Sequence, residues 1–189
     1  MTNYVLLDRD GVINHDSDDF IKSPAEWHAI DGSLDAIALL NQHGFRTVVI
    51  SNQSGLARGL FDETMLNCIH EKMCSSVNEK GGHIDAIYFC PHHADDLCEC
   101  RKPKTGLLKQ FAAEKQVALD KTFFIGDSLR DIQAAQSVGA TPILVKTGNG
   151  KKTLHNNPQL LTSLLIFEDL HDAANYLICL LYTSDAADE

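Results

Sequence analysis

Short apolar runs alternate along this chain with stretches whose apolar residues recur at helical spacing. This alternation predicts an α/β fold, because parallel strands need a long connection between them that a helix usually supplies. We expect a doubly wound, mostly parallel sheet of the Rossmann-like kind. The predicted strands are Tyr4–Asp8, Arg46–Ser51, Ala86–Cys90, Thr122–Gly126 and Thr141–Lys146. The predicted helices are Ser33–His43, Asp62–Lys80, Thr105–Gln116, Leu129–Val138 and Glu168–Leu180.

The size and charge of the chain narrow its possible partners. With 189 residues, 44% of them hydrophobic, one domain with a sizeable core is expected, and we place it at residues 1–178. Residues 179–189 show no clear pattern, and we expect a disordered or non-native tail there. A net charge of −10 argues against non-specific nucleic-acid binding. It does not argue against a small anionic substrate, because local cations and a metal can override the overall field.

The sequence carries no targeting or membrane signal. No apolar run reaches the roughly 18–20 residues that a membrane helix needs, and the chain begins without a basic region or a cleavage site. We therefore expect a cytoplasmic protein that does not bind membranes, and we also expect a monomer. In that compartment its six cysteines are more typical of thiols or metal ligands than of disulfides.

Two aspartates, Asp8 and Asp10, follow the first predicted strand. Residues two apart on a strand point to the same side, so both carboxylates should emerge at the edge where open α/β sheets place their ligands. Carboxylates this close repel unless a cation neutralises them or one keeps its proton. The pair indicates a Mg²⁺ site, a nucleophile with an acid/base partner, or both; a plain Asp-Gly turn after a strand is the alternative.

Small polar residues follow the second predicted strand. Hydroxyl, amide and glycine residues after a buried strand form turns whose backbone N–H groups can bind phosphate oxygens. Arg58, a few residues further, adds a cation able to bind phosphate with two hydrogen bonds. An ordinary polar turn is the alternative. The candidate phosphate- or substrate-binding residues here are Ser51, Asn52, Gln53, Ser54 and Arg58.

Four soft ligands lie within eleven residues after the third predicted strand, in the pattern C-x-H-x₅-C-x-C. Such a set suits a tetrahedral Zn²⁺ ion, and four protein ligands would make the metal structural rather than catalytic. The alternative is a group of reduced or buried thiols, and spacing alone does not separate His92 from His93. The candidate zinc ligands are Cys90, His92, Cys98 and Cys100.

Further candidate site residues are charged, and they follow the last cysteine and the fourth predicted strand. Arg101 and Lys102 directly follow the last cysteine, where a zinc loop could fix their direction; two solvated charges are the alternative. Asp127 ends the fourth predicted strand and could add a third carboxylate to a Mg²⁺ site, or could cap a helix. Asp131, four residues later, could support that site or lie on the surface.

Taken together, these motifs resemble the four ordered motifs of the haloacid dehalogenase-like (HAD) phosphohydrolases. The resemblance spans residues 4 to 150 and implies a fold without a cap domain. It also implies that Asp8 is the nucleophile, that Asp10 is the acid/base, and that Ser51 and Lys102 hold the phosphoryl oxygens. The Mg²⁺ ion would be held by the Asp8 and Asp127 carboxylates and the Asp10 backbone carbonyl.

The zinc loop narrows the resemblance to two related groups of capless phosphatases, one acting on heptose 1,7-bisphosphate and one on histidinol phosphate. The turn Ser51–Gly59, with its Ala-Arg-Gly ending, resembles the heptose group, which supplies heptose for bacterial lipopolysaccharide. It implies that Arg58 and Arg101 bind the rest of a phosphorylated sugar. Ser51 stands where threonine is often found, and Ser128 where some relatives carry lysine. A receiver-like signalling domain is the alternative outside enzymes.

Overall fold

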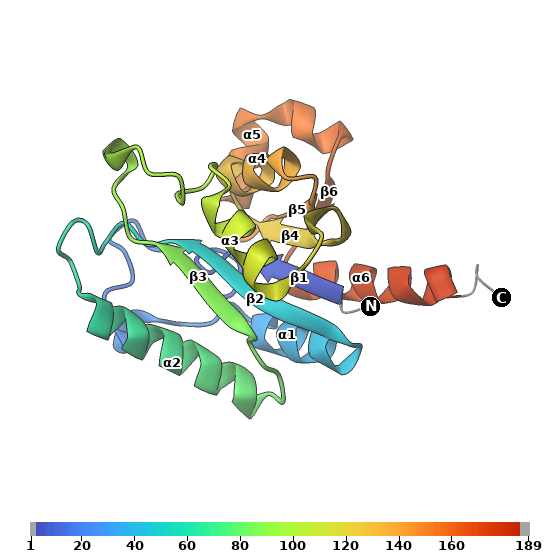
Figure 1. Ribbon diagram of the computed structural model, residues 1–189. Helices are drawn as coiled ribbons and strands as arrows, with labels where there is room; N and C mark the ends of the chain where they lie inside the picture. Colours follow the sequence, from blue (N-terminus) through green and yellow to red (C-terminus); the bar gives the residue numbers. More distant parts are fainter. Residues whose placement is uncertain (1–2, 186–189) are drawn as a thin grey trace.

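The computed structural model, described here for residues 3–185, is built on a six-stranded sheet in which all neighbouring strands run parallel (Figure 1). The strand order is β3-β2-β1-β4-β5-β6, so the chain moves outward from β1 to one edge and then crosses back. This confirms the predicted doubly wound parallel sheet. The strands are β1 Asn3–Leu7, β2 Phe45–Asn52, β3 Ala86–Cys90, β4 Phe123–Gly126, β5 Thr141–Val145 and β6 Leu165–Phe167.

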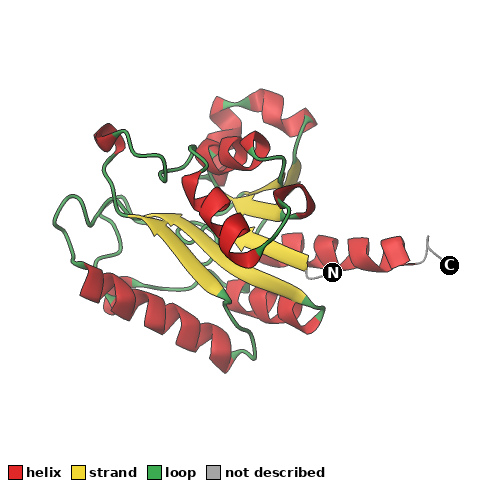
Figure 2. Ribbon diagram, in the orientation of Figure 1, coloured by secondary structure: helices red, strands yellow, loops and turns green. Residues whose placement is uncertain are grey.

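Helices cover both faces of the sheet (Figure 2). Successive strand residues point to opposite faces, so Val5 and Leu7 pack with α1, α2 and α6, whereas Tyr4 and Leu6 pack with α3 and α4. The helices are α1 Ser33–Gln42, α2 Glu63–Glu79, α3 Gly106–Lys115, α4 Leu129–Ser137, α5 Gly150–Asn156 and α6 Leu170–Asp185. The described residues also form the short 3₁₀ helices η1 Pro24–Glu26, η2 Ala94–Asp96, η3 Leu119–Lys121 and η4 Pro158–Thr162.

The C-terminal part differs most from the expectation. Helix α5 and strand β6 were not predicted, because seven and three residues are too few to show a clear period. Helix α6 continues beyond the predicted end at Leu180 to Asp185, so residues 179–185 of the expected tail are helical. Residues 186–189 of that tail lie outside the described residues, and a non-native origin of residues 179–189 stays a prediction.

The strand order reverses between β1 and β4, whose registers pair Leu7 with Ile125. Open α/β sheets bind ligands at such a switch point, beyond the carboxyl ends of the strands. In residues 3–185 the connections from β1 to β2 and from β2 to β3 contain α1, α2 and η1 but no second sheet, in keeping with the expected capless fold. Within the same residues, no helix has both the length and the apolar character needed to cross a membrane.

Candidate active site

Three carboxylates meet at the switch point. Asp8 follows β1, Asp127 follows β4, and Asp131 lies in the first turn of α4. One oxygen from each can be chosen so that the three atoms lie within 4.8 Å of one another. The structure therefore brings Asp8 and Asp127 together as the sequence predicted, and adds Asp131, whose role the sequence left open.

The three carboxylates are buried close together, which disfavours three negative charges there. Burial raises the pKa of Asp8 well above its usual range, and the nearby Asp131 and Asp127 raise this pKa further. Burial and the charge of Asp131 raise the pKa of Asp127 to about 7. A hard divalent cation would offset this repulsion, and carboxylate oxygens are the ligands that Mg²⁺ prefers. The residues present therefore fit a Mg²⁺ ion.

Lys102 lies against two of these carboxylates. Its Nζ is 2.9 Å from Asp8 Oδ1 and 2.7 Å from Asp131 Oδ1, and its side chain is only 2% exposed. Burial lowers the pKa of Lys102, but the charges of Asp131 and Asp8 raise it by more, so the ammonium group stays protonated. Asn52 fixes the backbone here: its Oδ1 accepts from Lys102 N at 3.0 Å and its Nδ2 donates to Lys102 O at 3.2 Å.

Neighbouring polar groups hold the other two carboxylates in place. Asp131 Oδ2 accepts from Ser128 N at 3.1 Å and from Ser128 Oγ at 2.6 Å, so Ser128 is the N-cap of α4 and Asp127 is not. Asp127 Oδ2 accepts from Asn149 N at 2.7 Å. Gly11, at φ +82°, allows close approach, since a Cβ there would lie 2.1 Å from Asp127 Oδ2. Both carboxylates are therefore fixed before any ligand arrives.

The Asp10 side chain lies apart from this carboxylate group, among hydrogen-bond donors. Arg9, Asn14 and Gln53 all donate to its carboxylate. Burial raises the pKa of Asp10, but the Arg9 charge and the three donors lower it by more, so the pKa falls below its usual value. Asp10 in this arrangement is ionised, which is the form that can accept a proton.

A cavity of about 310 Å³ opens above these groups. It is lined by Asp8, Asp10, Asn52, Gln53, Ser54, Arg58, Arg101, Lys102 and Asp127, all predicted site residues. Ser51, also a predicted site residue, is 1% exposed and is not among the lining residues. The cavity is also lined by residues that the sequence did not assign individually to the site: Asp16, Ser17, Asp18, Phe20, Ile21, Ser128, Arg130, Asp131 and Asn149. Arg130 and Asn149 could have been found, because each follows shortly after a predicted strand.

The lining arginines Arg58, Arg101 and Arg130 form what we call the arginine rim. Within residues 3–185 none of the three makes an ion pair with a carboxylate. Burial lowers the pKa of Arg101, and the like charges of Arg130 and Arg58 lower it further, so Arg101 is close enough to both of them to be repelled. The guanidinium of Arg58 lies 5.5 Å from the ring centre of Phe20. An anionic group would relieve this repulsion.

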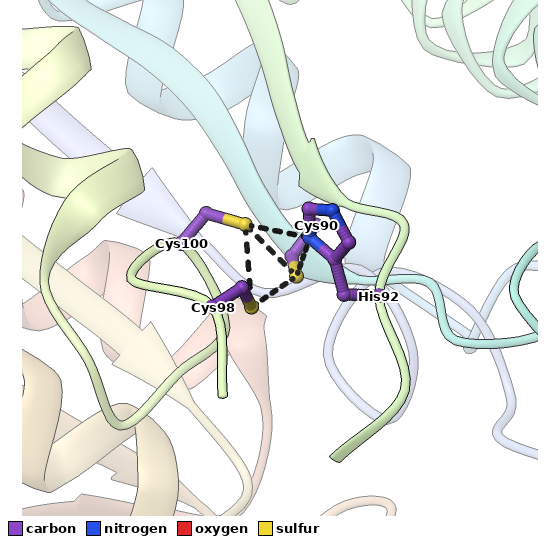
Figure 3. Close-up of side chains that lie close together, drawn as sticks. All are labelled: Cys90, His92, Cys98 and Cys100. Carbon is purple, nitrogen blue, oxygen red and sulfur yellow. Dashed lines mark hydrogen bonds between the residues drawn. The ribbon is translucent and has the colours of Figure 1, made fainter. Parts of the chain in front are cut away.

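The cysteines and histidine of the loop after β3 converge on one point (Figure 3). His92 Nδ1 is 3.2 Å from Cys100 Sγ, and Cys90 Sγ is 3.1 Å from Cys100 Sγ and 3.6 Å from Cys98 Sγ. Zinc–ligand bonds of about 2.0–2.3 Å in a tetrahedron place ligand atoms roughly 3.5–3.8 Å apart, so the cluster fits a Zn²⁺ ion after a small expansion. All four cysteine and histidine residues predicted as zinc ligands are therefore brought together.

His93 does not join this cluster. Its backbone and ring instead cap η2: His93 N donates to Asp96 Oδ2 at 2.7 Å, and His93 Nδ1 accepts from Asp95 N at 3.3 Å. The structure thus separates two histidines that spacing could not. The loop then runs directly from Cys100 to Arg101 and Lys102, so it connects the cluster to the cavity.

Comparisons with known proteins place this geometry in a family. A family described as HAD-hydrolase-like matches residues 99–173. The D-glycero-beta-D-manno-heptose-1,7-bisphosphate 7-phosphatase of Bordetella bronchiseptica is 51% identical over 174 residues, covering 92% of this chain and 97% of that protein. The enzyme of the same name from Pseudomonas putida is 47% identical, covering 92% and 98%. The crystal structure of D,D-heptose 1,7-bisphosphate phosphatase from B. bronchiseptica, complexed with magnesium and phosphate, has a TM-score of 0.90 at 50% identity, covering 93% of this chain and 98% of that one.

Proposed function

The chain belongs to the family of D-glycero-beta-D-manno-heptose-1,7-bisphosphate 7-phosphatases, and we propose that it hydrolyses the 7-phosphate ester of that sugar bisphosphate. The observation that carries the proposal is the division of charge in the cavity. Its floor holds Asp8, Lys102 and Asp127, which can bind and attack a phosphoryl group. Its rim holds three arginines that make no ion pair with a carboxylate of residues 3–185, and these can bind a second phosphate.

The chain's own residues supply the steps of hydrolysis. Asp8 attacks phosphorus and forms an aspartyl-phosphate, while Asp10, having taken up a proton, donates it to the departing sugar oxygen. Asp10, now a carboxylate, then takes a proton from water, whose oxygen attacks the aspartyl-phosphate and releases inorganic phosphate and free Asp8. Lys102 and the Ser51 hydroxyl hold the phosphoryl oxygens, since phosphoryl transfer depends mostly on positioning and charge stabilisation.

Two metals complete the proposal. Mg²⁺, which the crystallised B. bronchiseptica relative binds together with phosphate, would be held by Asp8 and Asp127 and the Asp10 backbone carbonyl, and would supply positive charge beside the phosphoryl group. Asp131, 1% exposed and paired with Lys102, would neutralise that lysine and position it rather than bind substrate. Zn²⁺ at Cys90, His92, Cys98 and Cys100 would fold the loop that carries Arg101 and Lys102.

The arginine rim also argues against the rival substrate. Histidinol phosphate carries one phosphate and a cationic amine, and the three guanidinium groups of the arginine rim would repel that amine. A heptose bisphosphate brings a second phosphate to the same place, where arginine can bind it with paired hydrogen bonds. A receiver-like domain would need neither Asp10 as an acid/base nor a cysteine cluster. A cytoplasmic monomer with one domain at residues 1–178, acting in lipopolysaccharide precursor synthesis, remains part of the proposal.

A phosphate-release panel tests the proposed function. The protein with Mg²⁺ is assayed on both anomers of heptose 1,7-bisphosphate, on fructose 1,6-bisphosphate and on histidinol phosphate. We expect kcat/KM to be highest for the heptose bisphosphates, with release of the 7-phosphate only. Arg130→Met should raise KM for the bisphosphate by about 10-fold or more and change KM for a heptose 7-monophosphate little, because one charge-assisted contact is worth roughly 1.5–3 kcal/mol. Highest activity on histidinol phosphate would overturn the assignment, and no turnover of any ester would favour a receiver.

A further inference from the structure

The carboxylate of Asp10 receives four hydrogen bonds from three buried side chains, which we call the Asp10 clamp: Arg9, Asn14 and Gln53. Arg9 donates from Nε to Oδ1 at 2.9 Å and from Nη2 to Oδ2 at 3.0 Å. Asn14 Nδ2 donates to Oδ1 at 2.9 Å, and Gln53 Nε2 donates to Oδ2 at 2.9 Å. Both oxygens of the carboxylate are therefore held from two directions.

We propose that Arg9 and Gln53 are positioning residues that aim Asp10 at the leaving oxygen of the substrate. The inference rests on the proposed function, in which Asp10 is the acid/base, and deepens it. Arg9 lies between Asp8 and Asp10 in the sequence, so its paired hydrogen bonds to the Asp10 carboxylate restrain the backbone just after β1. Gln53 directly follows β2, and its hydrogen bond to Asp10 connects this segment to the neighbouring strand.

Arg9 has no access to substrate. It is 1% exposed, it does not line the cavity, and its fork faces the Asp10 carboxylate. A planar guanidinium that binds both oxygens fixes the plane of the carboxylate as well as its place, which a lysine at the same position would not do. The orientation of Asp10 therefore depends on the arginine fork and not only on a nearby positive charge.

Gln53 has its donor group committed to protein. Besides Asp10 Oδ2, its Nε2 donates to Ser51 Oγ at 2.7 Å. Since the Ser51 oxygen accepts this hydrogen bond, the Ser51 hydroxyl hydrogen remains available to a phosphoryl oxygen. Ser51 is a residue of β2 and is held by that strand, so Gln53 is needed to position Asp10 but not to position Ser51. In this role Gln53 acts through Asp10, and the expected direct contact between Gln53 and substrate is an outcome that the test below separates.

The test uses the need for a leaving-group proton. A sugar alkoxide needs a proton to leave, whereas p-nitrophenolate is a stable anion that leaves without one. Rapid-quench single turnovers measure the first step on heptose bisphosphate, and the burst of p-nitrophenol measures it on p-nitrophenyl phosphate. For Gln53→Met and Arg9→Lys we expect the sugar rate constant to fall about 10²-fold, the p-nitrophenol burst to fall less than about 3-fold, and KM to stay within about 3-fold.

Matched variants separate the possible outcomes. Arg46→Lys and Gln110→Met make the same changes on the surface, away from the cavity, and should match the unchanged protein on both substrates. Asp10→Asn should show the same dependence on the leaving group, with a loss of roughly 10²–10⁴-fold on the sugar. If Asp10→Asn shows no such dependence, the role of Asp10 in the proposed function is wrong.

If Asp10→Asn shows the dependence and a folded Gln53→Met does not, the positioning role is wrong while the proposed function stands. A parallel rise of KM on both substrates in Gln53→Met would mean that Gln53 binds the phosphate directly, which also overturns the inference. Circular dichroism and thermal melting check that each variant is folded. If Arg9→Lys does not fold, Gln53→Met alone decides, because its amide can be replaced by an apolar group of similar length.

Discussion

The carboxylate group and the cysteine–histidine cluster are both suited to a metal, yet they are assembled in opposite ways. Asp8 lies more than one hundred residues before Asp127 and Asp131 in the sequence, and the three meet only because β1 and β4 are neighbours. Residues 90–100 supply the whole soft-ligand cluster from one loop (Figure 3). The first arrangement depends on the sheet, whereas the second needs only local folding and a metal to hold it.

Lys102 connects the two regions. It lies two residues after Cys100, and its Nζ pairs with Asp8 and Asp131 while donating to Ile50 O at 2.8 Å. The loop that carries the cysteine–histidine cluster therefore also positions Lys102, the cation that pairs with the carboxylates of the active site. We expect damage in one region to reach the other in one direction only: loss of the cysteine–histidine cluster should harm the active site, whereas loss of Asp8 should leave the cluster intact.

The largest effect is expected at the nucleophile. Asp8→Asn should lower kcat by on the order of 10⁴–10⁶-fold, because an amide is a poor nucleophile and a weak Mg²⁺ ligand. Zinc content, measured by elemental analysis of protein purified without added metal, should stay at about one per chain. Steady-state activity close to that of the unchanged protein would remove Asp8 from the mechanism, and loss of zinc would contradict the one-directional coupling.

A smaller effect is expected in the soft-ligand loop. Cys100→Ser should lower zinc content, reduce thermal stability and lower kcat/KM on the order of 10²-fold, since a misplaced Lys102 is enough to slow phosphoryl transfer. Cys68→Ser, a half-buried cysteine of α2 outside the cluster, is the matched control and should keep zinc and activity. Zinc-free Cys100→Ser protein with full kcat/KM would show that the loop does not position Lys102.

The smallest effect is expected at the histidine that caps η2. His93→Ala should keep zinc and keep kcat/KM within about 3-fold, at a cost of about 0.5–1 kcal/mol in the free energy of unfolding, the size of a typical lost cap. His92→Ala should instead lose zinc, because its Nδ1 lies within 3.6 Å of two cysteine sulfurs. Urea unfolding and zinc analysis of the pair decide, and loss of zinc in His93→Ala alone would reverse the assignment.

The sequence predicted the site residues that lie close together along the chain or directly after a strand. The rule that ligands lie at carboxyl strand ends located Asp8, Asp10, Ser51 and Asp127 at one edge, and the cavity there contains three of them. The rule does not single out residues within a long loop: Asp16 and Phe20 reach the cavity from the segment between β1 and α1, which has no regular period. Asp131 was left open because a carboxylate in the first turn of a helix is as typical of a surface as of a site.

By itself, the sequence determined the parallel sheet and the loop with the cysteine–histidine cluster. The periodicity of strands and helices and the spacing of the four cluster residues can each be recognised within a short stretch of sequence. The tertiary structure alone decided which groups neutralise one another: that Lys102 is buried between Asp8 and Asp131, that Gln53 faces Asp10 and Ser51, and that three arginines meet at one rim. Hydrogen bonds and ion pairs act over a few ångströms, and only the packing of distant strands and loops brings such groups within that range.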